Sequence, residues 1–129
     1  MSVTDNGNVT LAIENGIATI SFYHPAQNSL PTVLLNELTD KITAAGNDPQ
    51  TRVIILKSGG DRTFCAGASF DELLQIKDKQ QGAEFFSGFA RVINACRKSP
   101  KISANLWFRY MNFSFCTTYM PIVDFSASV

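Results

Sequence analysis

The dipeptide Asn15-Gly16 lies between two segments in which apolar and polar residues alternate, and it constrains the fold strongly. The alternation predicts two strands joined by a type I′ turn, because this turn needs positive φ at both central residues. A two-residue loop pairs Glu14 with Ile17 and places the remaining apolar positions opposite one another. The resulting pairs are Ile13 with Ala18, Leu11 with Ile20, and Val9 with Phe22. The sequence therefore predicts an antiparallel hairpin with one apolar face.

A helix and a buried strand are predicted after the hairpin. Apolar residues recur at helical spacing at Leu34, Leu38, Ile42 and Ala45. Gly46 is predicted to close this helix as a left-handed cap. The continuous apolar run at 53–56 predicts a central strand that is covered on both faces. The long crossover from Phe22 to this run is compatible with parallel pairing, which is typical of an α/β protein.

Two further helices are predicted in the second half. Ser69 and Glu72 fit the S-x-x-E capping box, so a short helix is expected from about Ser69 to Ile76. One face of a longer helix is traced by Phe85, Phe86, Phe89, Ile93 and Cys96. This helix is predicted to end near Arg97 and Lys98, before Pro100. We interpret its phenylalanine stripe as helical core, not as a cofactor site.

A loop rich in small residues separates the apolar strand from the capping box. It reads Gly59-Gly60-Asp61-Arg62-Thr63-Phe64-Cys65-Ala66-Gly67-Ala68. A strand, loop and helix in this order direct backbone N–H groups toward one place, where they can hold a negative charge or a developing oxyanion. The loop matches neither common nucleotide-phosphate motif, so a phosphate cradle is disfavoured. From these residues alone, a plain connection between strand and helix is an equal alternative.

The residue order of the run 64–73 resembles the enoyl-CoA hydratase/isomerase (crotonase) family, whose members carry a phenylalanine, a small residue and Ala-Gly-Ala-Asp at this turn. The segment 26–30 resembles the family's Asn-Ala-Leu segment, which follows an Arg-Pro pair; here that pair is His24-Pro25. The resemblance covers about residues 8–101. It implies an α/β, crotonase-like (ClpP/crotonase) fold, of which this chain holds the N-terminal ββα repeat region and is incomplete.

The resemblance also implies a substrate and its contacts. The backbone N–H of Ala68 would be one of two donors to the thioester oxygen of an acyl-CoA, and would be the catalytic group of this chain. Substrate or CoA contacts are implied at Ala26, Asn28, Ala66, Gly67, Ala68, Ser69, Phe70 and Asp71. Small side chains suit such contacts, because a backbone can be approached closely only where no bulk intervenes.

The activity implied in this way is hydration of a 2-enoyl-CoA or isomerisation of its double bond through an enolate-like thioester, a lyase type of reaction in fatty acid metabolism. No cofactor is expected, since coenzyme A is part of the substrate. The resemblance further implies a homo-oligomer, a trimer or hexamer. The alternative is a non-catalytic fragment that binds CoA thioesters or takes part in subunit assembly.

The resemblance is lost after Lys101. Family members continue with a strand, a glycine-rich turn that gives the second oxyanion donor, and a helix with the acid/base glutamates. This chain has no glycine after Gly88, and Asp124 is its only carboxylate side chain beyond Lys101. We therefore expect a crotonase-like part over residues 1–101 and a divergent, aromatic-rich tail over 102–129. The chain alone is expected to be truncated and inactive.

Composition excludes several other classes. The 11 basic residues balance the 11 acidic ones, so neither nucleic acid nor an anionic membrane is an expected partner. The N-terminus lacks the pattern of a signal peptide, so a cytoplasmic protein is predicted. Three distant cysteines and one histidine indicate neither a disulfide framework nor a metal site. Cys65 is interpreted as a packed residue rather than a nucleophile, and His24 as a loop residue rather than a base.

Overall fold

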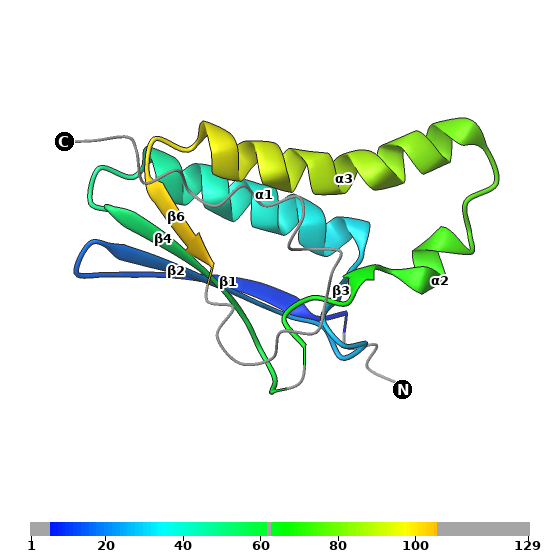
Figure 1. The fold of residues 1–129 in the computed structure, drawn as a ribbon, viewed down its shortest axis with the longest axis horizontal. Helices are drawn as coiled ribbons and strands as arrows, with labels where there is room; N and C mark the ends of the chain where they lie inside the picture. Colours follow the sequence, from blue (N-terminus) through cyan, green and yellow to red (C-terminus); the bar gives the residue numbers. More distant parts are fainter. Residues whose placement is uncertain (1–5, 62, 106–129) are drawn as a thin grey trace.

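The computed structural model describes residues 6–61 and 63–105 of the 129-residue chain as a mixed α/β structure. Its elements are β1 (Asn8–Glu14), β2 (Ile17–Tyr23), β3 (Ser29–Leu30), α1 (Thr32–Asn47), β4 (Val53–Ser58), β5 (Gly67–Ala68), α2 (Phe70–Leu73), α3 (Lys79–Lys98) and β6 (Ile102–Asn105). Figure 1 shows α1 lying over the larger sheet and α3 lying over α1. Sheet, α1 and α3 thus form three successive layers.

The predicted hairpin is confirmed in its turn and its register. Asn15 has a φ of 52° and Gly16 a φ of 82°, as the turn requires. Every pair expected from the alternation is present, from Glu14 with Ile17 to Val9 with Phe22. Ala18, Ile20 and Phe22 are buried beneath α1, so the sequence pattern correctly identified the inner face.

The larger sheet has the strand order β1-β2-β4-β6, in which β4 pairs in parallel with both β2 and β6. The prediction of a central, parallel strand is therefore confirmed. The expectation that β4 is covered on both faces is wrong for the described residues, because the two long helices lie on one side of the sheet (Figure 1). Ile54 and Leu56 are buried on that side, whereas Val53 and Ile55 are only half-buried.

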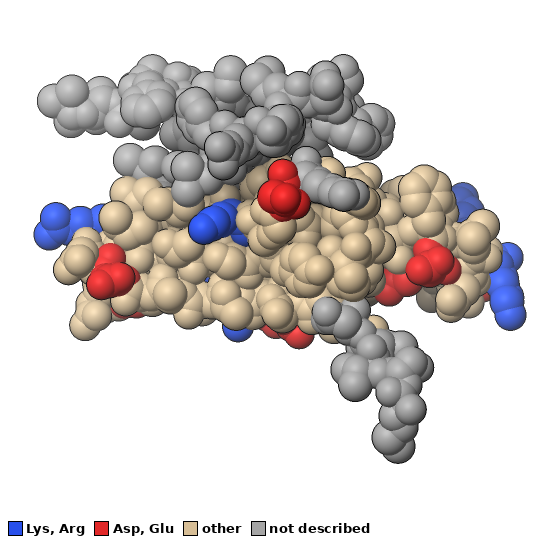
Figure 2. Space-filling view, turned by 90° about the horizontal axis from the view of Figure 1, so that it is seen from below, with Lys and Arg blue, Asp and Glu red and all other residues tan. Residues whose placement is uncertain are grey.

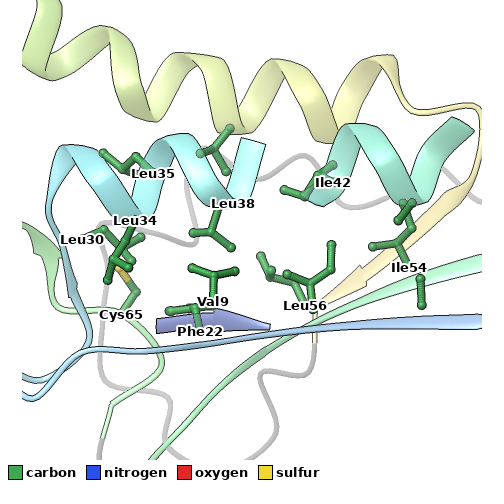
Figure 3. Packing of buried hydrophobic residues seen from close by; sticks show 14 residues of the cluster. Val9, Phe22, Leu30, Leu34, Leu35, Leu38, Ile42, Ile54, Leu56 and Cys65 are labelled. Carbon is green, nitrogen blue, oxygen red and sulfur yellow. The ribbon is translucent and has the colours of Figure 1, made fainter. Parts of the chain in front are cut away.

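The hydrophobic core lies between α1 and the sheet, as Figure 3 shows. From α1 come Leu34, Leu35, Leu38, Ile42 and Ala45, all nearly inaccessible to solvent. The sheet contributes the inner residues of β1, β2 and β4, and Leu30 and Cys65 extend the cluster toward the small sheet. Burial of this apolar surface is the main favourable term for folding, at about 25 cal/mol per Å².

Gly46 does not cap α1. The helix continues through Asn47, and Gly46 is absent from the glycines with positive φ. A Cβ at Gly46 would lie 2.9 Å from Ser99 Oγ, just beyond the end of α3. The glycine is therefore explained by the close approach of this neighbouring segment, a long-range contact that a local capping pattern cannot reveal.

The helix α3 ends at Lys98, as predicted, but its buried face differs slightly from the expected stripe. Phe85 and Val92 are buried and Phe89 packs against the core. Phe86 is 58% exposed, so its assignment to the core is wrong. Because one helical residue turns the side chain by about 100°, Phe85 and Phe86 cannot both face α1.

After α3 the chain enters β6, which pairs with β4 from Ile102 to Asn105. The sequence alone supported no assignment of secondary structure for these four residues. Most of the proposed tail, residues 106–129, lies outside the described residues. No helix in the described ranges is long and apolar enough to cross a membrane. Figure 2 shows few charged side chains on the visible face of the described part.

Candidate functional site

Asn28 joins two loops that are 31 or more residues apart in sequence. Its side-chain amide donates to the carbonyl oxygens of Gly59 and Thr63, each at 2.7 Å, while Asn28 Oδ1 accepts from the N–H of His24 at 2.9 Å. Asn28 is 4% exposed and has a φ of 56°. This left-handed conformation, which asparagine tolerates better than most residues, aims the amide into the 59–63 loop. The side chain thereby holds the turn before β3 against the loop before β5.

The strands β3 and β5 form a small parallel sheet in which Ser29 faces Gly67 and Leu30 faces Ala68. In such a ladder, one residue of a facing pair bonds to the neighbours of the other. Pro31 has no N–H, so the Leu30–Ala68 pairing is made by the N–H of Leu30, donating to Gly67, and the carbonyl of Leu30, accepting from Ser69.

This pairing fixes the direction of the Ala68 N–H. Within the trans peptide that joins Gly67 to Ala68, the carbonyl oxygen and the N–H point in opposite directions. Because the Gly67 oxygen faces β3, the Ala68 N–H is directed away from β3. The local geometry therefore leaves that donor available to the other side of β5.

Gly67 has a φ of 105°, a conformation that L side chains rarely adopt. Among the residues that the structure describes, a Cβ placed there would meet no heavy atom within 4 Å, so this part of the molecule leaves open space beside Gly67. The Cys65 sulfur accepts a hydrogen bond from the Gly67 N–H at 3.3 Å. Phe64 packs its ring edge-on against Phe22 of β2, with centroids 5.2 Å apart. The contacts of Cys65 and Phe64 thus hold the loop in place, while its backbone at Gly67 remains accessible.

The capping box is confirmed in one of its two hydrogen bonds. Ser69 Oγ accepts from the Glu72 N–H at 3.5 Å and caps α2, which is shorter than expected and ends at Leu73. The Glu72 carboxylate does not return to Ser69. Instead Glu72 Oε2 accepts from the N–H and the hydroxyl of Thr32 at 2.9 and 2.8 Å, at the first turn of α1. This contact depends on tertiary structure, which explains why the local motif did not reveal it.

The structure brings most of the expected site residues to one end of the sheet. Asn28 lies beside the loop that contains Ala66, Gly67 and Ala68, all half-buried, and Ser69 follows as the buried cap of α2. Phe70 is 73% exposed. Ala26 and Asp71 are also exposed, Ala26 in the 24–28 turn and Asp71 on α2. Sequence reasoning missed Pro31, which belongs to no local motif, and the contact of Glu72 with Thr32, which the local capping box does not predict.

The described contacts of His24 are structural. His24 Nδ1 accepts from the Ala26 N–H at 3.2 Å and lies 3.3 Å from Ser29 Oγ, so it supports the turn. Burial raises the pKa of the Cys96 thiol, which favours its neutral form. Within residues 6–61 and 63–105, no group of three or more His, Cys, Asp or Glu side chains could hold a metal ion.

Comparisons with known proteins agree on one family. A family model described as enoyl-CoA hydratase/isomerase matches residues 12–104. Crotonyl-CoA hydratase of Syntrophomonas wolfei is 31% identical over 100 residues, which are 75% of this chain and 38% of that protein. The mitochondrial enoyl-CoA hydratase domain-containing protein 2 of Bos taurus is 37% identical over 68 residues, which are 52% of this chain and 23% of that protein.

Solved structures of this kind of protein also match most of the chain. Enoyl-CoA hydratase from Bacillus anthracis is similar with a TM-score of 0.68 and 27% sequence identity, covering 78% of this chain and 38% of that one. An enoyl-CoA hydratase from Mycobacterium smegmatis has a TM-score of 0.69 at 21% identity, covering 75% and 38%, and supports the fold alone. The chain therefore spans well under half the length of these relatives.

Proposed function

Because the chain belongs to the enoyl-CoA hydratase/isomerase family, we propose that the loop 63–69 binds the thioester group of an acyl-CoA through the N–H of Ala68. The observation that carries this proposal is the direction of that N–H, which points away from β3 and follows a glycine whose backbone is open to approach in the described part of the chain. A thioester oxygen approaching from that side would meet a donor, and Gly67 itself adds no side-chain bulk beside it. The site would act on acyl-CoA substrates, with coenzyme A as part of the substrate and no further cofactor.

The chemistry of such a site is stabilisation of negative charge. Hydration or isomerisation of an enoyl thioester develops charge on the carbonyl oxygen, and a fixed N–H donor stabilises this charge without reorganising at the moment of reaction. A single donor of this kind contributes about 3 kcal/mol to the transition state. Ala68 would supply this donor, while the small residues Ala66 and Gly67 permit the approach of the ligand.

The other proposed contacts are assigned according to their geometry. Because every hydrogen bond described for the Asn28 side chain goes to the protein's own backbone, a contact of Asn28 with CoA would use its backbone. Ser69 would also contribute backbone atoms, since its hydroxyl caps α2. Ala26, Phe70 and Asp71 are exposed and remain proposed CoA contacts. A homotrimer or homohexamer and a cytoplasmic location also remain proposals.

The residues after Lys101 favour a second proposal, in which the chain binds acyl-CoA without catalysis. Asp124 is the only carboxylate side chain beyond Lys101, and that stretch contains no glycine for a second oxyanion turn. These features favour a chain that binds acyl-CoA without turning it over, the non-catalytic alternative. Subunit assembly with other copies is the other role open to such a fragment.

We expect the 129-residue chain to bind butyryl-CoA and to hydrate crotonyl-CoA far more slowly than an ordinary enzyme, for which turnover is about 10 per second. Calorimetric titration with butyryl-CoA measures the first property, and loss of the enoyl absorbance measures the second. Binding without turnover supports both proposals. Turnover near 10 per second would contradict the non-catalytic reading, and the absence of any binding would contradict the thioester site.

A further inference from the structure

Glu72 is a carboxylate that caps a helix other than its own. The helix α1 begins at Thr32, after Pro31, which offers no side-chain cap. Glu72 Oε2 accepts hydrogen bonds from the N–H and the hydroxyl of Thr32, at 2.9 and 2.8 Å. A negative group at this position satisfies an N–H that the helix itself leaves unpaired, and it also favours the positive end of the helix dipole.

The same carboxylate completes a closed set of contacts around Ala68. On one side of Ala68, Gly67 accepts from the N–H of Leu30, and on the other side Ser69 donates to the carbonyl of Leu30. Three residues after Ser69, Glu72 holds Thr32. Leu30 and Thr32 flank Pro31. The segment 30–32 therefore contacts β5 through Leu30 and α2 through Thr32.

We infer that Glu72 is a positioning residue for the thioester site, because its contact with Thr32 stabilises the β3–β5 pairing that fixes the direction of the Ala68 N–H. The inference rests on the proposed acyl-CoA function. Without the carboxylate, α2 loses its hydrogen bonds to Thr32. Of the described hydrogen bonds between segments 29–32 and 67–72, only the two-residue pairing of β3 with β5 then remains to resist rotation of the peptide before Ala68. Two paired residues form too short a ladder to be stable by themselves.

The ligand-free test is backbone amide exchange of the 129-residue chain, followed by NMR. In Glu72→Ala, the amide protons of Leu30 and Ser69 are expected to exchange about tenfold faster than in the unsubstituted chain, as loss of a hydrogen bond to a charged group allows. Amides of the β1–β2 hairpin serve as an internal reference and should not change. Glu37→Ala, which removes an exposed carboxylate from α1, is the matched control and should leave Leu30 and Ser69 unchanged.

The second test separates orientation of the donor from stability of the fold. Butyryl-CoA offers a thioester oxygen to Ala68, whereas S-butyl-CoA is a thioether that lacks this oxygen. Glu72→Ala should weaken binding of butyryl-CoA by roughly tenfold and binding of S-butyl-CoA much less, because only the thioester uses the Ala68 donor. Glu72→Gln retains an oxygen acceptor for Thr32 and should restore most of the affinity for butyryl-CoA.

The outcomes are distinguishable. Unchanged exchange of Leu30 and Ser69 in Glu72→Ala would show that the carboxylate does not hold the loop, and would overturn the inference. Equal loss of affinity for both CoA compounds would limit Glu72 to general stability and would overturn the positioning role. If the unsubstituted chain binds neither compound, the proposed function fails, and amide exchange alone decides whether Glu72 holds β5 against β3.

Discussion

Replacing Asn28 with alanine is expected to lower the free energy of unfolding by about 3 kcal/mol, a large part of the stability of a domain this size. The substitution removes the partner of two carbonyl oxygens and one N–H, those of Gly59, Thr63 and His24. A buried polar group left without a partner costs about 1–3 kcal/mol. Urea unfolding followed by circular dichroism would measure the change as a shift in midpoint with little change in slope.

Two further variants make this measurement specific. Asn36→Ala removes an exposed asparagine whose side chain accepts from Arg91 Nη2 at 3.4 Å, and it should change stability by less than about 0.5 kcal/mol. Asn28→Gly loses the same hydrogen bonds as Asn28→Ala but accommodates the φ of 56°, so it should be the less damaging of the two. Equal midpoints for Asn28→Ala and Asn36→Ala would show that Asn28 does not hold the loops together.

Gly67→Ala is expected to weaken binding of butyryl-CoA by about tenfold or more. A φ of 105° is nearly inaccessible to alanine, and holding a residue in such a region costs about 1–3 kcal/mol. The chain would relieve this strain by rotating the peptide between residues 67 and 68, which carries the Ala68 N–H. Because a Cβ at Gly67 would meet no atom of the described residues within 4 Å, a clash with those residues cannot account for the loss.

The matched control is Gly82→Ala, the same chemical change inside α3. A Cβ at Gly82 would lie 3.7 Å from Ile76 Cγ2, an ordinary contact, and glycine within a helix is less favourable than alanine by about 1 kcal/mol. This variant should therefore keep its affinity and gain stability. If both variants bind butyryl-CoA equally well, the conformation of Gly67 has no part in ligand binding.

The hairpin and the order of the larger elements could be predicted from sequence because their determinants are local. The pair Asn15-Gly16 specifies its own turn, and a period of two then assigns every residue of β1 and β2 to a face. The end of α3 is marked by Pro100, and the apolar run at 53–56 identifies the central strand. In each case, a few adjacent residues contain the information.

The predictions from sequence were wrong mainly where segments distant in the chain contact one another. A glycine near a helix end usually caps it, but Gly46 is small because Ser99 lies against it. The side chain of Glu72 was expected to complete a local box, whereas it reaches Thr32, 40 residues earlier. The prediction for Phe86 was wrong for another reason. A stripe of three phenylalanines does not indicate which of two adjacent rings faces the core.

The position of the candidate site could be predicted from the family resemblance of the sequence, whereas its geometry depends on contacts made in the folded chain. The run of small residues at 66–68 indicated a backbone that a ligand can approach, but nothing in it indicated where the Ala68 N–H points. That direction depends on pairing with Leu30, a residue 38 positions earlier. The hydrogen bonds of Asn28 to the 59–63 loop are likewise invisible in a single sequence, because both partners are backbone carbonyls.

Pro31 has a consequence for which hydrogen-bonding pattern the small sheet adopts. In the other pattern open to the Leu30–Ala68 pair, the Ala68 N–H would donate to the Ser29 carbonyl, and the N–H of residue 31 would donate to the Ala68 carbonyl. Proline has no N–H, so this pattern would form one bond fewer than the native one. In a ladder of two residue pairs, that single missing donor is a large fraction of the total. An imino acid outside the strand thus selects the pattern in which β3 does not consume the Ala68 amide.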